Sequence, residues 1–92
     1  MTRMRLIDLA EFLGDHKFRE FTLEIDYLLK LTFQSVYVFF TPDVILFRND
    51  NGNYVNLSEV YEIYLIDDER EIILRYIETN GLQRTARIIL HP

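Results

Sequence analysis

The sequence contains no cysteine. This absence excludes disulfide frameworks, thiolate metal sites and cysteine nucleophiles. Basic residues are also scarce, because 10 lysines and arginines stand against 15 aspartates and glutamates, which gives a net charge of −5. A protein that binds the phosphate backbone of nucleic acids is normally basic. We therefore do not expect nucleic acid as a partner.

Long hydrophobic runs are missing as well, since every apolar stretch is far shorter than a membrane span. The first such stretch, Leu6 to Leu13, is interrupted by Asp8 and Glu11, which is not typical of a signal peptide. We expect a soluble, cytoplasmic protein that has no membrane partner.

Apolar residues are nevertheless plentiful. A chain of 92 residues fits one domain, 1–92, with a modest core. Yet 49% of the residues are hydrophobic and 14% are aromatic. Residues 36–47, VYVFFTPDVILF, are large and apolar apart from the three residues Thr41-Pro42-Asp43. This surplus must be packed in the core or covered by a partner.

The N-terminal region has the pattern of a helix over residues 3–13. Apolar side chains recur there at helical spacing, at Leu6, Leu9, Ala10 and Leu13. Thr2 is placed to cap the start of this helix, and Gly14 to end it in a left-handed conformation.

Residues 18–33 fit two patterns. Alternate positions from Phe21 to Phe33 are apolar, which is typical of a strand, but Phe18, Phe21 and Ile25 also form a helical stripe. The strand is favoured, with a bulge near Leu28 that bends it, because a single straight strand of this length is rare.

From residue 36 onward the pattern predicts hairpins. Residues 36–40 and 44–48 flank a turn in which Pro42 presets the backbone angle of the second position. Asn51-Gly52 marks the next reversal. The remaining strand candidates are residues 54–57, 60–66, 71–77 and 82–90. The predicted fold is α+β, a short N-terminal helix packed on an antiparallel meander of about five to seven strands, and the alternative is a small all-β barrel.

The loop lengths predict the registers of the last strands. A four-residue loop at 67–70 places Ile72 opposite Leu65, and a three-residue loop at 79–81 places Ile72 opposite Ile88. Gly81 then takes the left-handed position that such a loop needs. A two-residue loop would turn charged side chains onto the apolar face, so the apolar pattern favours three residues.

The opposite face of these strands is half apolar with interspersed charges. A solvated face normally alternates more cleanly to polar residues. We therefore predict that this face is a partner interface. Its candidate residues are Tyr64, Ile66, Ile73, Arg75, Ile77 and Arg87.

No motif in the sequence carries chemistry. His16 and His91 lack metal-ligand spacing, and the acidic group at 67–69 supplies fewer oxygen ligands than a hard cation needs. We therefore expect no catalytic residue, no metal and no cofactor, and a protein that is not an enzyme.

One short stretch, Leu9-Ala10-Glu11-Phe12-Leu13-Gly14, resembles the first half of a DNA-binding helix-turn-helix. Glu20 stands where that pattern needs a buried aliphatic residue. Glu24 and Asp26 would repel phosphates from the recognition helix.

The leading functional hypothesis is a non-enzymatic protein-interaction or regulatory module. Its first expected partner is a second copy of itself, as a homodimer, and another protein is a further candidate partner. One alternative is a small-ligand-binding domain whose pocket is lined by Tyr37, Phe39, Tyr61 and Tyr76. A second alternative is a small acidic inhibitor that blocks a basic or nucleic-acid-binding partner.

Overall fold

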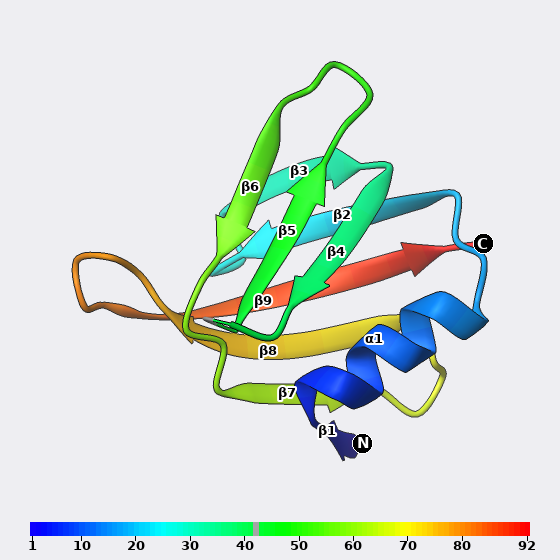
Figure 1. Ribbon diagram of the computed structural model, residues 1–92, viewed down its shortest axis with the longest axis horizontal. Helices are drawn as coiled ribbons and strands as arrows, with labels where there is room; N and C mark the ends of the chain where they lie inside the picture. The colour runs from blue at the N-terminus through cyan, green and yellow to red at the C-terminus, as the bar shows by residue number, and fades with distance from the viewer. Residues whose placement is uncertain (42) are drawn as a thin grey trace.

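The computed structural model describes residues 1–41 and 43–92, so the predicted role of Pro42 lies outside the described residues. Within these residues, one short helix and nine antiparallel strands confirm the α+β class (Figure 1). The elements in chain order are β1 (Thr2–Met4), α1 (Leu6–Asp15), β2 (Glu20–Ile25), β3 (Leu29–Phe33), β4 (Ser35–Phe39), β5 (Val44–Arg48), β6 (Tyr54–Leu57), β7 (Glu62–Leu65), β8 (Glu71–Ile77) and β9 (Gln83–His91).

The strands form two sheets rather than one meander. The large sheet has the order β1-β7-β8-β9-β2-β3, and the small sheet has the order β4-β5-β6. Figure 1 shows the small sheet and α1 on the same side of the large sheet. The chain leaves the large sheet after β3 and returns to it at β7. The alternative of a small all-β barrel is therefore wrong for the described residues, because both sheets keep edge strands and a helix completes the second layer.

The predicted registers of β7, β8 and β9 are confirmed. Ile72 lies opposite both Leu65 and Ile88. Gly81 has φ +85°, and the Glu78 amide donates to the Leu82 carbonyl at 2.9 Å, which closes the three-residue loop. Local turn chemistry and apolar alternation are sufficient to fix these pairings.

Residues 18–33 contain two strands joined by a tight reversal. Asp26 and Tyr27 have φ of 50° and 62°, and the Leu28 amide donates to the Ile25 carbonyl at 3.0 Å. Two successive positive φ angles are the signature of a type I′ turn. The predicted bulge near Leu28 is therefore wrong, since the chain reverses there instead of bending. The second half of a helix-turn-helix is absent as well, because β2 occupies residues 20–25.

The N-terminal prediction is wrong at both ends of the helix. Residues 2–4 form β1, which pairs with β7, and the helix begins only at Leu6. Its N-cap is Arg5, whose amide donates to the Asp8 carboxylate at 2.8 Å. Gly14 lies inside the last turn and does not end the helix.

The core lies between the large sheet and the layer formed by the small sheet and α1. Leu9 of α1 and Leu74 of β8 are fully buried in it. The ring centres of Phe33, in the edge strand β3 of the large sheet, and Phe47, in the central strand β5 of the small sheet, lie 5.6 Å apart, so the two sheets pack together there. One face of each sheet is thus used by the core, and the other face points outward.

Candidate functional site

The outward face of the small sheet is the first candidate. Its register pairs Tyr37 with Leu46 and Leu46 with Asn56, so these three side chains lie in one row across the sheet. The intervening residues of β5, Ile45 and Phe47, point inward and are fully buried. We define the small-sheet outer face by Ser35, Tyr37, Phe39, Val44, Leu46, Arg48, Tyr54 and Asn56.

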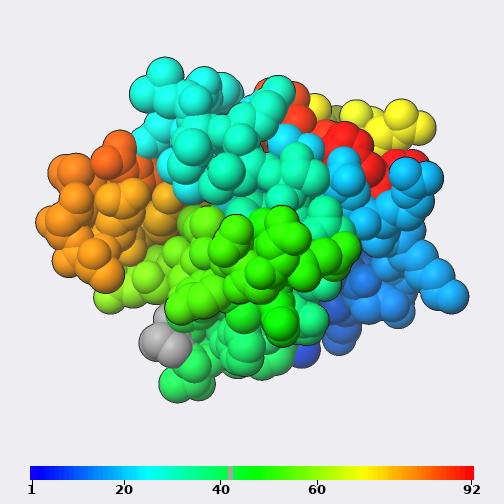
Figure 2. All heavy atoms as spheres, turned by 90° about the horizontal axis from the view of Figure 1, so that it is seen from above, coloured from blue at the N-terminus to red at the C-terminus, as the bar shows by residue number. Residues whose placement is uncertain are grey.

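The aromatic residues of this face are open to solvent. The exposed fractions of Tyr37, Phe39 and Tyr54 are 46%, 48% and 64%, and Phe40 beside them is 52% exposed. Figure 2 shows the green atoms of the small sheet as the outer layer on one side of the molecule. Several large apolar side chains that share one surface mark an interaction site more often than single scattered ones do.

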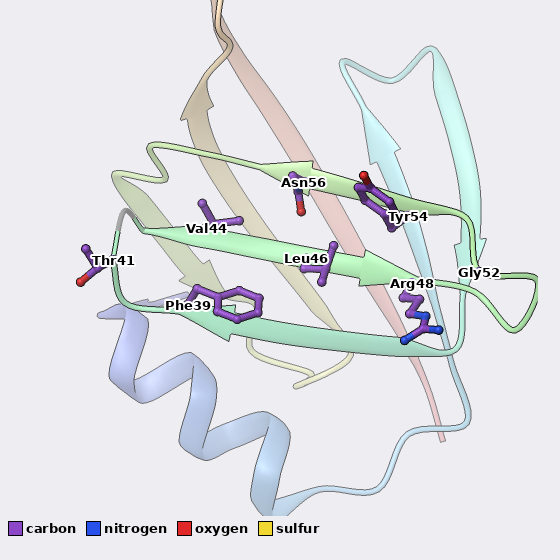
Figure 3. Close-up of a pocket in the computed structure, with 8 residues that line it drawn as sticks. All are labelled: Phe39, Thr41, Val44, Leu46, Arg48, Gly52, Tyr54 and Asn56. Carbon is purple, nitrogen blue, oxygen red and sulfur yellow. The ribbon is translucent and has the colours of Figure 1, made fainter.

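The small-sheet outer face is shallowly hollowed. The hollow has a volume of about 560 Å³ and reaches from Thr41 at one end to Gly52 at the other. In Figure 3, side chains of all three strands stand around it on the same side of the sheet. The end beside Phe39 and Val44 is apolar, whereas the end beside Arg48, Tyr54 and Asn56 offers polar groups.

Arg48 is the only charged residue of the small-sheet outer face. Its side chain is exposed, and it has no ion-pair partner among residues 1–41 and 43–92. An arginine without an internal partner is free to stack on an aromatic ring or to bind an anion from another molecule.

The six residues predicted as a partner face do come together, on the outward face of the large sheet. Tyr64 lies opposite Ile73, and Ile73 lies opposite Arg87. Five of the six are only partly exposed, and Arg75 is the exposed one. The role of this face as a partner interface stays a prediction.

Several charges of the large-sheet outer face are paired with one another, whereas Arg75 has no ion pair among the described residues. Arg87 Nη2 donates to Glu71 Oε1 at 2.8 Å, and Arg87 Nη1 lies 3.7 Å from Glu24 Oε2. The Arg3 guanidinium lies 5.8 Å from the centre of the Tyr64 ring. Because these groups are bound to one another, they are not free to bind a partner.

The four aromatic residues predicted to line one pocket are not brought together. Tyr37 and Phe39 point outward from β4, whereas Tyr76 is buried on the core side of β8. Tyr61 lies between β6 and β7 and does not line the hollow. The pocket as predicted is therefore wrong, although Phe39 lines a different hollow with other partners.

Both histidines are engaged locally. His16 Nδ1 lies 2.9 Å from the Phe12 carbonyl oxygen, and His91 Nε2 lies 2.9 Å from Thr22 Oγ1. Among the described residues no three histidine, aspartate or glutamate side chains are grouped to hold a metal ion. No helix in the described part of the chain has the length and apolarity needed to cross a membrane.

The clearest electrostatic perturbation lies at the β2–β3 turn. Arg84 Nη1 donates to Asp26 Oδ2 at 2.7 Å, and the Thr85 amide donates to Asp26 Oδ1 at 3.2 Å. These two bonds, with that from Arg84 the larger cause, lower the pKa of Asp26 below its ordinary value. The carboxylate anchors the strained turn to β9, which is a structural role.

Comparison of the chain with protein-family models, with curated proteins and with solved structures gives no match. We therefore infer the function from the surface geometry. Sequence reasoning did not select Leu46, Arg48, Tyr54 or Asn56 as site residues. The available signal was that both faces of the strands in residues 36–47 are apolar. Because the core covers only one of these faces, the other apolar face remains at the surface.

Proposed function

We propose that this protein is a non-enzymatic protein-interaction module that forms a homodimer, and that its docking surface is the small-sheet outer face. The observation that supports this most strongly is the exposure of Tyr37, Phe39 and Tyr54 on one shallowly hollowed face that carries a single charge.

The energetic reasoning follows from the cost of exposed apolar surface. Fully burying one large apolar side chain is worth about 1.5–3 kcal/mol. The centres of protein interfaces are enriched in aromatic residues and arginine and depleted of other charges. The small-sheet outer face has this composition, with Arg48 as its single charge.

The two alternatives have weaker support. A small-ligand site normally encloses most of its ligand, whereas the hollow between Phe39 and Tyr54 is a shallow depression on a sheet. An acidic inhibitor should gather unpaired carboxylates on one face, but on the large-sheet outer face Glu24 and Glu71 are bound to Arg87.

Sedimentation velocity of the purified chain tests the proposal. We expect a monomer–dimer equilibrium in the micromolar range that persists at high salt, because apolar association is not screened by ions. Two matched variants place a glutamate at the centre of each outer face, Leu46→Glu on the small sheet and Ile73→Glu on the large sheet.

Leu46→Glu should weaken the dimer by at least about tenfold, since it buries an unpaired charge in the interface. Ile73→Glu should leave association unchanged, provided that its circular dichroism spectrum shows a folded chain. A monomer at all concentrations contradicts the proposal. Loss of the dimer only in Ile73→Glu would move the docking surface to the large sheet.

A further inference from the structure

We propose that two copies stack their small-sheet outer faces about a two-fold axis that runs across the strands, so that β5 lies antiparallel to β5 of the partner. This arrangement rests on the proposed function above and specifies its geometry. A homodimer interface of this kind must be complementary to itself. Two such arrangements are possible, one with the two-fold axis along the strands and one with the axis across them. The distribution of residues along β5 decides between them.

The position of Arg48 selects the antiparallel arrangement. A two-fold axis along the strands would place the two Arg48 residues over each other, about 10 Å apart across the packed sheets. An axis across the strands, at the level of Leu46, separates them by a further distance of about 13 Å along the strand direction. The side chains of both arginines point into the gap between the packed sheets, so the first arrangement would bring the two like charges together in a desolvated interface, where they repel strongly, and only the second arrangement avoids this.

The residues that lie on this two-fold axis are of types that pack well against the same residue of a second copy. Tyr37, Leu46 and Asn56 lie in register across β4, β5 and β6, so each meets the same residue of the partner. A tyrosine ring packs on another ring, and a leucine packs on a leucine. The asparagine amide carries both a donor and an acceptor, so two copies are able to pair with each other.

The rows away from the axis complement each other. The antiparallel stack places Arg48 of one copy over Val44 of the other, next to Phe39, which is paired with Val44 in the sheet. Both Phe39 and Arg48 are open to solvent in the single chain. An arginine over an aromatic face is a favourable contact, and it occurs twice in the dimer. The polar end of each hollow therefore covers the apolar end of the other.

The size of the face predicts a weak dimer. Three strands of about five residues give a contact area of about 14 by 17 Å in outline. This is small beside the roughly 800 Å² of accessible surface that each partner buries in a standard interface. The exposed Phe40 at the rim adds apolar contact. Dissociation in the micromolar range follows, and an interface this small leaves the dimer concentration-dependent.

The absence of cysteine permits a direct test of the arrangement. Thr41 and Asn53 are exposed at opposite ends of the small-sheet outer face. Thr41→Cys and Asn53→Cys variants, one of them with a mass tag, are mixed and treated with a bis-maleimide whose reach matches the roughly 10 Å between packed sheets. We expect the mixed Thr41–Asn53 product to exceed both same-variant products several-fold, and Leu46→Glu in both chains to abolish it.

The outcomes separate this inference from the proposed function. Dominant same-variant products would overturn the antiparallel arrangement and indicate the parallel one. A dimer in sedimentation without any cross-link would overturn the face-to-face stack, and would indicate pairing through an edge strand such as β3, while the homodimer would stand. A monomer in sedimentation contradicts the function itself.

Discussion

The outer faces of the two sheets differ in how their charges are arranged. On the large sheet an ion-pair chain crosses β3, β2, β9 and β8. Lys30 Nζ lies 3.2 Å from Glu24 Oε1, Glu24 Oε2 lies 3.7 Å from Arg87 Nη1, and Arg87 Nη2 lies 2.8 Å from Glu71 Oε1. On the small sheet Arg48 is the single charge of the outer face, and its cross-strand neighbours are Ser35 and Tyr54.

This difference shows that an apolar residue count alone does not identify a docking face. Ile73 and Ile77 are large and apolar but only partly exposed, and Ile73 lies opposite the long charged side chain of Arg87. Tyr37 and Phe39 lie opposite the apolar residues Leu46 and Val44, whereas Tyr54 lies opposite Arg48. All three aromatic side chains are about half exposed or more. Interspersed charge pairs are typical of a solvated sheet face, whereas a face with a single charge and several exposed aromatic side chains is typical of a surface that another molecule covers.

The largest expected effect comes from comparing the two sides of the small sheet. Phe47→Ala should lower the free energy of unfolding by about 3–5 kcal/mol, because the ring is fully buried and its loss leaves a cavity. Phe39→Ala on the outer side should change it by less than about 0.5 kcal/mol. Urea denaturation below the dimer dissociation constant measures both. Equal losses would show that the outer face is already packed within one chain.

A pair of arginine variants compares the charges of the two outer faces. Arg87→Met removes the partner of both Glu24 and Glu71 and should cost about 1 kcal/mol at low salt. Arg48→Met, which breaks no ion pair in the described chain, should be close to neutral in the monomer. The Arg87 effect should shrink in high salt because exposed charges are screened. A salt-independent loss would mean that packing of the arginine stem dominates.

The smallest effect concerns the turn at the end of the large sheet. The pKa of Asp26 is lowered by the bond from Arg84, so the pair is fully formed above the ordinary aspartate pKa of about 3.9. Its contribution is lost as the pH falls through the lower pKa of the folded state. Asp26→Asn keeps a residue that tolerates positive φ. The stability difference between wild type and Asp26→Asn should be constant near neutral pH and shrink below about pH 4.

Urea denaturation from neutral pH to about pH 3 follows this difference. The change should be smaller than that of Arg87→Met, because Asp26 loses only its charge and keeps an acceptor for the Thr85 amide. A difference that persists unchanged in acid would assign the effect to turn geometry rather than to the ion pair.

Much of the fold was predictable where neighbouring strands are joined by short turns. The hairpins of β7, β8 and β9 follow from Gly81 and from the alternation around Ile72. The reversal at Asp26-Tyr27 was not predictable, because only Asp26 is of a type that tolerates positive φ, and Tyr27 stands where such a turn normally has glycine. The candidate site was predictable only as a surplus of apolar residues in 36–47, without its location.

The sequence by itself determined the α+β class, most strand positions and which residues share a face of each strand, because turn chemistry and side-chain alternation are local properties. Only the tertiary structure decided that β4, β5 and β6 leave the large sheet and that β2 pairs with β9 across the length of the chain. Both faces of β5 are apolar except at Arg48, so alternation cannot choose which face is buried. Packing made that choice: the pairing of β2 with β9 and the return of the chain at β7 turn Ile45 and Phe47 inward, and Leu46 and Arg48 consequently remain at the surface.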